Sequence, residues 1–222
     1  MKFNYFLILI LGNFSIIYGQ EFSDANLNIP GCTELCKSKM VISTGYNPVT
    51  NNAYAPNSVD DFWKITASTT TLPGCIPPCS STVIDRTITP GYLMPDLRSN
   101  WISYNTNYNL VNAGTITFER VFYVNQDATI FGGISLACDN ECKFSLSGPS
   151  GIILTGGYPE NADINFKKYK PFEFKAAAKC GQYILKVQLR NVSGYTALNV
   201  SATVKSDKNS LSNNNGCCLK CQ

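Results

Sequence analysis

Histidine is absent from this chain of 222 residues, which removes the side chain that most often serves as a general base or metal ligand. The sequence also lacks a G-x-S-x-G motif, an H-E-x-x-H motif and a glycine-rich phosphate loop. Glycosidase chemistry would need only two carboxylates, but pairs of them arise by chance among 15 Asp and Glu residues. We therefore expect a protein without enzymatic activity.

Charged residues are scarce as well, at 15% of the chain, and the formal net charge is +3. The basic residues are scattered, and Lys167, Lys168 and Lys170 form the only cluster in the sequence. A solvated turn explains this cluster better than an anion site. Binding of nucleic acid requires a basic stripe, which the sequence lacks, so nucleic acid is not expected as a partner.

Long apolar runs are missing except near the N-terminus, where Lys2 precedes the run Phe6–Leu11. This run becomes polar too soon for a stable membrane span, and Gly19 provides a small residue before a cleavage site. The pattern predicts a secretory signal peptide over residues 1–19, with a retained anchor as the alternative. We expect the mature chain to be secreted and extracellular, without a membrane span.

Cysteine, in contrast, is abundant, and an even number of cysteines in a secreted chain predicts a disulfide framework. Eight of the ten form C-x-x-x-C pairs and two stand apart: Cys32/Cys36, Cys75/Cys79, Cys138/Cys142 and Cys217/Cys221, then Cys180 and Cys218. Zinc held by thiolates is the rival interpretation, which an oxidising compartment and the lack of histidine disfavour.

The sequence leaves the disulfide pairing open. A bridge within a C-x-x-x-C pair closes about five residues and contributes about 2 kcal/mol in the chain-entropy model. A bridge from Cys180 to Cys138 or Cys142 would close about forty residues and contribute about 4 kcal/mol in that model. The three cysteines near the C-terminus also allow bonds between chains.

Short runs of alternating apolar and polar residues, separated by Gly, Pro, Asn and Ser, predict an all-β protein. Strands are expected near Met40–Ser43, Val59–Ser68, Val83–Ile88, Trp101–Tyr104, Thr115–Val124, Ile130–Leu136, Phe144–Leu146, Ile152–Leu154, Pro171–Lys175, Tyr183–Leu189 and Leu198–Val204. These strands predict a jelly-roll-like antiparallel β-sandwich over residues 45–205. Residues 20–44 are interpreted as an N-terminal arm, and residues 206–222 as a flexible, cysteine-rich tail.

Arg120 breaks the alternation of its strand. Strict alternation would place its charge on the apolar face, which is costly without a partner. A bulge that turns Arg120 outward would resolve the conflict, as would a pair with Glu119 or Asp127.

Several motifs occur in an order found in known secreted modules. Asp60–Ile65 is followed by Asn100–Ser103, Thr117–Phe122, Ala137–Asn140, Pro171–Phe174 and Gly181–Leu185. Over residues 45–205 this series resembles the galactose-binding-like β-sandwich modules of secreted proteins. The resemblance implies a jelly roll that binds carbohydrate or protein and is not catalytic. The cysteines around the Asp-Asn turn and the cysteine-bearing arms depart from that family, so no sugar specificity is carried over.

Four residues are candidates for modification or metal binding. Asn191 and Asn199 begin N-x-S sequons and are candidate glycosylation sites. Asp139 and Glu141 are candidate calcium ligands, although turn hydrogen bonds explain them equally well. No other cofactor is expected.

Aromatic residues supply the candidate carbohydrate-binding site. Trp63 and Trp101 have the parity of core residues in their strands. Tyr104 and Tyr108, on the loop that follows Trp101, are therefore the better candidates for stacking against a sugar ring.

These observations favour a non-enzymatic extracellular structural subunit that assembles with other copies of itself, for example into filaments. Two cysteine-bearing arms, the lack of a catalytic constellation and a binding-type fold motivate this hypothesis. In addition, Met40–Ser43 could add as a strand to the sheet edge of a neighbouring copy. The alternative is a monomeric, secreted, lectin-like module whose partners are extracellular glycans.

Overall fold

The computed structural model describes residues 36–85, 91–109, 112–158 and 165–213. Regular structure within these ranges is entirely β. In chain order the strands are β1 (Lys39–Val41), β2 (Tyr46–Asn47), β3 (Asn52–Ala53), β4 (Val59–Ser68), β5 (Cys79–Val83), β6 (Ile102–Ser103), β7 (Gly114–Val124), β8 (Ala128–Asp139), β9 (Glu141–Gly148), β10 (Gly151–Gly157), β11 (Lys170–Ala178), β12 (Gly181–Asn191), β13 (Ala197–Ser206) and β14 (Leu211–Ser212). The described residues contain no helix with the length and hydropathy needed to cross a membrane.

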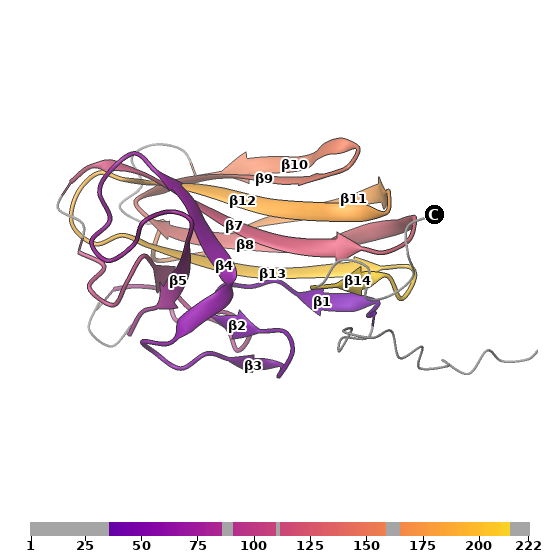
Figure 1. Cartoon of the computed structure of the whole chain (residues 1–222), viewed down its shortest axis with the longest axis horizontal. Coiled ribbons are helices and arrows are strands. Elements are labelled where there is room, and N and C mark those ends of the chain that lie inside the picture. The colour runs from indigo at the N-terminus through magenta and orange to yellow at the C-terminus, as the bar shows by residue number, and fades with distance from the viewer. Residues whose placement is uncertain (1–35, 86–90, 110–111, 159–164, 214–222) are drawn as a thin grey trace, which may run out of the picture. The chain divides into compact units, whose positions relative to one another are not determined.

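Twelve of the strands form one antiparallel hydrogen-bonded sheet, and ten of them follow each other in the order β10-β9-β12-β7-β4-β5-β6-β13-β8-β11 (Figure 1). Strand β1 is added beside β13, β14 is added beside β7, and β2 and β3 form a separate hairpin. The path folds back on itself, since the rings of Phe144 on β9 and Phe172 on β11 meet at a centroid distance of 4.8 Å. The result is an antiparallel β-sandwich, as the sequence predicted, in which β10, β9, β12 and β7 form one sheet and β13, β8 and β11 form the opposite sheet.

Alternation along the strands explains why the two faces pack together. In β7, Ile116, Phe118, Phe122 and Val124 point inward and are fully buried. The inward residues of β8, β12 and β13 join them in one continuous core. Strand β4 spans the predicted range Val59–Ser68 and contributes its inward residues to the same core.

The prediction of a strand at Val83–Ile88 was wrong. Strand β5 instead begins at Cys79, which pairs with Ile65 of β4, and ends at Val83. The proline-rich appearance of the preceding residues hid this strand, because its first residue belongs to the Cys75–Cys79 disulfide loop. Residues 86–88 lie outside the described ranges.

Parts of the predicted arm and tail pair with the sandwich of their own chain. Strand β1 pairs with β13 of its own chain, and Met40 is buried in the core. Strand β14 pairs with β7, and Leu211 is also buried. The side chain of Asn125 fixes this second segment by donating to the Ser212 hydroxyl at 2.7 Å and the Ser210 carbonyl at 3.2 Å.

Two of the local disulfides are present among the described residues. Cys75–Cys79 and Cys138–Cys142 have Cα separations of 5.8 and 6.3 Å. A bond from Cys180 to Cys138 or Cys142 is therefore excluded, because those two cysteines bond to each other. Cys36 and Cys180 are disulfide-bonded as well. Four of the predicted cysteines, Cys32, Cys217, Cys218 and Cys221, lie outside the described residues, as does the predicted signal peptide.

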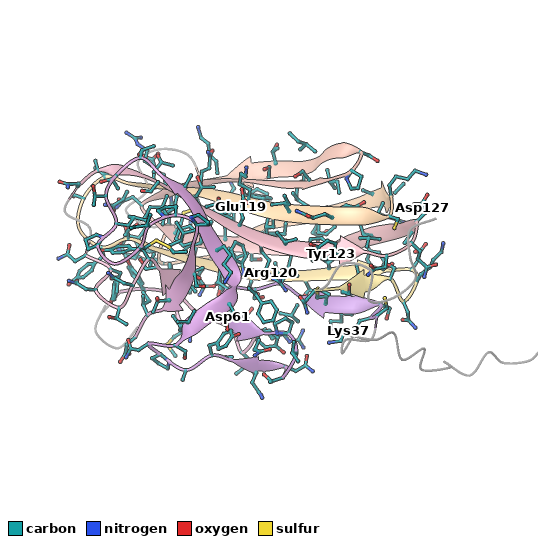
Figure 2. The ribbon with its side chains drawn as sticks, viewed as in Figure 1. Lys37, Asp61, Glu119, Arg120, Tyr123 and Asp127 are labelled. Carbon is teal, nitrogen blue, oxygen red and sulfur yellow. A yellow bond between two sulfur atoms is a disulfide. The ribbon has the colours of Figure 1, made fainter. Side chains whose placement is uncertain are left out.

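Arg120 points into the sandwich and is buried, so the expectation of an outward turn or a carboxylate pair was wrong. Its guanidinium lies 4.7 Å from the centre of the Phe62 ring and donates hydrogen bonds to the Val121 carbonyl and the Asn213 side chain. Glu119 instead pairs with Lys186, and Asp127 pairs with a lysine at the far end of the strands (Figure 2). A cation–π contact and hydrogen bonds thus hold the buried guanidinium.

Gly132 on β8 should be the least tolerant glycine of the sandwich. A Cβ at this position would lie 2.0 Å from the Thr203 carbonyl oxygen on the neighbouring strand β13, and backbone cannot move aside cheaply. Gly132→Ala is expected to lower the free energy of unfolding by about 2–3 kcal/mol, through forced separation of the two strands. Urea denaturation of the disulfide-intact protein measures this loss.

Gly133→Ala is the matched control one residue away. The nearest heavy atom to its new Cβ would be 3.8 Å distant, an ordinary contact. The control should stay within about 0.5 kcal/mol of the parent. Equal stability of the two variants would show that β8 and β13 do not approach closely at Gly132.

Candidate functional site

An open groove of about 560 Å³ lies on the outer face of the sheet, over β11, β8, β13 and β1. The register of these four strands determines its chemistry, because residues directly opposite each other share a face. The inward side chains of the strands are largely committed to the core, so most side chains that line the groove come from the alternate, outward positions.

The first transverse row of the groove crosses all four strands. Lys39 on β1 is opposite Lys205 on β13, and Lys205 is opposite Phe131 on β8. Phe131 is in turn opposite Lys175 on β11. All three lysines are exposed and Phe131 is half-buried. An aromatic ring therefore lies between cations on both sides.

The second row supplies the floor of the groove. Gly133 on β8 lies between Thr203 on β13 and Glu173 on β11. The absence of a side chain at Gly133 leaves a depression between a hydroxyl and a carboxylate. The third row continues with hydroxyls, since Ser135 on β8 is opposite Ser201 on β13.

One end of the groove is walled by the segment Gly91–Trp101, which covers the rest of the same sheet face. The rings of Tyr92 and Trp101 meet in a tilted arrangement at a centroid distance of 4.5 Å and pack over Ala137 and Ala197. The segment brings Arg98 to the groove.

Two hydrogen bonds hold this wall in place. The Tyr92 hydroxyl donates to the Asp139 carboxylate at 2.7 Å, and the Trp101 indole donates to the Leu93 carbonyl at 2.9 Å. Burial raises the pKa of Asp139, and the Tyr92 hydrogen bond opposes this shift. Burial and the neighbouring carboxylate raise the pKa of Tyr92, so its hydroxyl remains a donor. A further bond links the Ser201 hydroxyl to Asp96 of the wall.

The groove is dominated by positive charge. Lys39, Arg98 and Lys205 line it, against the carboxylate of Glu173. A second depression of about 280 Å³ shares Lys39 and Arg98 with the groove and adds Lys37. The three ion pairs found among the described residues involve none of these cations. The two depressions thus form one continuous surface, which carries four basic side chains: Lys37, Lys39, Arg98 and Lys205.

The predicted carbohydrate-binding tyrosines do not lie in the groove. Tyr104 and Tyr108 are only 3% and 2% exposed, so neither offers a ring face to a sugar. Tyr108 packs on Tyr195, which covers it from the neighbouring loop. The interpretation of Trp63 and Trp101 as buried residues agrees with the structure, since both are fully buried.

The two candidate glycosylation sites are also enclosed. Asn199 does point outward, but Tyr169 covers it and donates a hydrogen bond to its side-chain oxygen at 3.1 Å. Asn191 is fully buried, and its amide donates to the Asn112 carbonyl at 3.4 Å. A glycan on either side chain would require these contacts to break, so the fold gives no support to the expected exposure.

The candidate calcium ligands are engaged within the protein. Asp139 accepts hydrogen bonds from Tyr92 and from Asn140, the latter at 2.7 Å. Glu141 pairs with Arg190 at 3.2 Å. No three His, Cys, Asp or Glu side chains gather as metal ligands within the described part of the chain.

The carboxylates do not form a hydrolytic pair in the groove. Glu173 is the one carboxylate among its described lining residues, whereas glycoside hydrolysis uses two. Asp60 is fully buried elsewhere and accepts hydrogen bonds from the backbone amides of Gly45, Phe62 and Trp63. Burial raises the pKa of Asp60, and these amide bonds oppose the shift. Its role is to hold the chain entering β4.

The groove residues were missed at the level of sequence because the outward positions of β8 and β13 were treated only as solvent-facing. The adjacent glycines Gly132 and Gly133 were the available signal, since glycine inside a strand marks close approach of another backbone or a ligand. Which strands flank these glycines, and hence which side chains surround them, depends on long-range pairing that alternation does not reveal.

No protein-family model and no curated protein sequence matches the chain. Similar solved structures include a family 35 carbohydrate-binding module from an environmental isolate, with 14% identity over 55% of this chain and 80% of that one, at a TM-score of 0.32. A family 29 carbohydrate-binding module has 10% identity over 76% and 87%, with a TM-score of 0.31. The Stig cyclase Fisc from Fischerella sp. TAU has 8% identity over 75% and 98%, with a TM-score of 0.41. These similar structures include both binding modules and enzymes, so function must be inferred from the groove itself.

Tyr92→Phe tests the attachment of the groove wall. The variant keeps the ring contact but leaves the buried Asp139 carboxylate with one donor fewer, which should cost about 1–3 kcal/mol of unfolding free energy at neutral pH. The pKa of Asp139 is raised by folding, and the variant raises it further. The loss should therefore be largest above the folded-state pKa of the variant and shrink as the pH falls and Asp139 becomes protonated. Urea denaturation at a series of pH values measures it.

Tyr123→Phe is the control for this experiment, because its hydroxyl makes no hydrogen bond to the described residues and lies on the opposite sheet (Figure 2). The control should match the parent at every pH. A Tyr92→Phe loss that did not change with pH would show that Asp139 is not the partner that matters.

Proposed function

We propose that this chain is a secreted, non-catalytic carbohydrate-binding protein that uses the groove over β11, β8, β13 and β1. The observation that carries the proposal is the floor at Gly133, hollowed between the ring of Phe131, the hydroxyls of Ser135 and Thr203, and the carboxylate of Glu173. Saccharides combine apolar ring faces with dense hydroxyl groups. An aromatic ring beside several donors and acceptors is chemically suited to both.

The shape of the groove also suits a saccharide chain. It is open to solvent and is bounded at one end by the Gly91–Trp101 segment, whereas sites for small ligands enclose most of their ligand. The groove is built on strands of the sheet, which have a rigid backbone. A ligand would therefore bind to side chains that are already in place. Moderate affinity per site is the expectation for such a surface.

Assembly into filaments, which the sequence favoured, loses the donor strand suggested for it. The donor strand expected at Met40–Ser43 is already bonded to β13 of the same chain. The amide of Ile42 donates to Ala202 at 3.0 Å and that of Thr44 donates to Val200 at 2.9 Å, which continues the pairing beyond β1. Donating this strand to another copy would break the chain's own sheet, so we favour the lectin-like alternative.

Gly133→Leu tests the proposal by filling the floor of the groove. Its backbone lies outside the left-handed region and its surroundings accept a Cβ, so the fold should tolerate the side chain. The parent is expected to retain at least one glycan on an array of neutral and acidic glycans, and Gly133→Leu to weaken that binding at least tenfold. Titration calorimetry with the retained glycan gives the ratio.

Ser145→Leu is the matched control, because Ser145 faces outward on β9 of the opposite sheet. It should leave binding unchanged while adding the same apolar side chain. Equal binding by the parent and Gly133→Leu would place the glycan elsewhere on the protein. Failure of the parent to retain any glycan would remove the proposed function.

A further inference from the structure

Two lysines face each other across β1 and β13 in the groove. Lys39 and Lys205 are directly opposite in the antiparallel register and on the same outer face. Like charges in this relation destabilise a sheet. The repulsion between Lys39 and Lys205 therefore lowers the stability of the sheet locally, whereas a lysine opposite a carboxylate would not.

The opposite sheet shows the arrangement that avoids this cost. Lys186 on β12 is directly opposite Glu119 on β7, and their charged groups are 2.9 Å apart. Arg190 on β12 is likewise opposite Glu141 on β9, at 3.2 Å. Cross-strand charges on one outer face are thus complementary, whereas those on the groove face have the same sign.

Further cations approach the lysine pair from both sides. Arg98 reaches the same groove from the wall segment, and Lys175 follows on β11 beyond Phe131. None of these four cations takes part in the ion pairs of the described residues. Glu173 opposes them from the second row, and Asp96 opposes them from the wall beside Ser201. The groove therefore keeps an excess of positive charge that a bound anion would balance.

We infer that the groove binds saccharides that carry anionic groups, either the carboxylates of uronic acids or sulfate esters. This inference rests on the proposed function and specifies its ligand class. The acidic group lies between Lys39 and Lys205, where it relieves their repulsion, and the sugar ring lies on Phe131. The hydroxyls of Ser135 and Thr203 bind the adjoining part of the saccharide.

The test compares acidic and neutral saccharides that share a backbone: dextran sulfate with dextran, and oligogalacturonate with its methyl ester. Binding is measured by titration calorimetry with the full secreted, disulfide-intact protein. The acidic member of at least one pair should bind at least tenfold more tightly than its neutral counterpart. Raising the ionic strength from about 0.05 M to about 0.5 M should weaken that binding, because screening reduces the charge attraction.

The double variant Lys39→Gln/Lys205→Gln is expected to weaken binding of the acidic saccharide about tenfold, through loss of two ion pairs. Its unfolding midpoint should stay equal to the parent or rise, because the two like charges no longer repel. Lys143→Gln is the matched control, since Lys143 is exposed on β9 of the opposite sheet. This control should leave both affinity and stability unchanged.

Each alternative outcome has a distinct meaning. Preference for the sulfated or the uronate probe identifies the source of the anionic group. Neutral glycans could bind the parent, bind more weakly to Gly133→Leu and bind equally well to the Lys39→Gln/Lys205→Gln variant. This result would overturn the acidic ligand class and leave the proposed function intact. Equal binding of polyglutamate or single-stranded DNA would show recognition of charge alone and overturn both. Retention of no saccharide at all would also overturn both.

Discussion

The position of β8 between β13 and β11 is the constraint on which the core and the groove both depend. Burial of Ile130, Ile134 and Leu136 fixes the inward face of β8, and the period of two then sends Phe131, Gly133 and Ser135 outward. A shift of one residue would exchange the two faces. Close approach at Gly132 adds a second constraint, because a Cβ at this position would lie 2.0 Å from the Thr203 carbonyl oxygen on β13. The shape of the groove is therefore determined by the packing of the core behind it.

Buried polar side chains attach the segments that the strand pattern does not hold. Asp60 binds the backbone amides of Gly45 and Phe62, Asn125 binds the β14 segment, and Asp139 binds Tyr92 of the groove wall. Such groups are costly to bury unless they are hydrogen-bonded, so each one specifies a single placement of its segment. The wall that bounds the groove depends on the hydrogen bond between Tyr92 and Asp139. The outline of the candidate site thus depends on Asp139, a residue that does not line the groove.

Much of the sandwich could be predicted from alternation, and most of the site could not. The ranges of β4, β7, β12 and β13 follow from their own residues, since the apolar face is visible in sequence. Strands β1 and β14 gain stability from long-range pairing with β13 and β7. The sequence therefore did not show that the strand near Met40–Ser43 pairs within its own chain, and it did not show β14 at all. Tyr104 and Asn199 were expected to be exposed and are buried, for a similar reason. Local parity places a side chain on a face of its strand, whereas another segment of the chain decides whether that face is covered.

The two outer faces of the sandwich differ in which charged residues lie opposite each other on neighbouring strands. This difference matters more than the number of charged residues on each face. With a formal net charge of only +3, the chain has nearly enough carboxylates to neutralise every cation. Glu119 and Glu141 lie opposite basic residues on the β9-β12-β7 side, where each cross-strand pair stabilises the sheet. On the groove side the same geometric relation joins Lys39 to Lys205. Stability alone would favour an acidic residue at one of these positions. A sheet that accepts repulsion at one place while avoiding it on its other face resembles other functional sites, where a local rule of stability is broken in favour of binding.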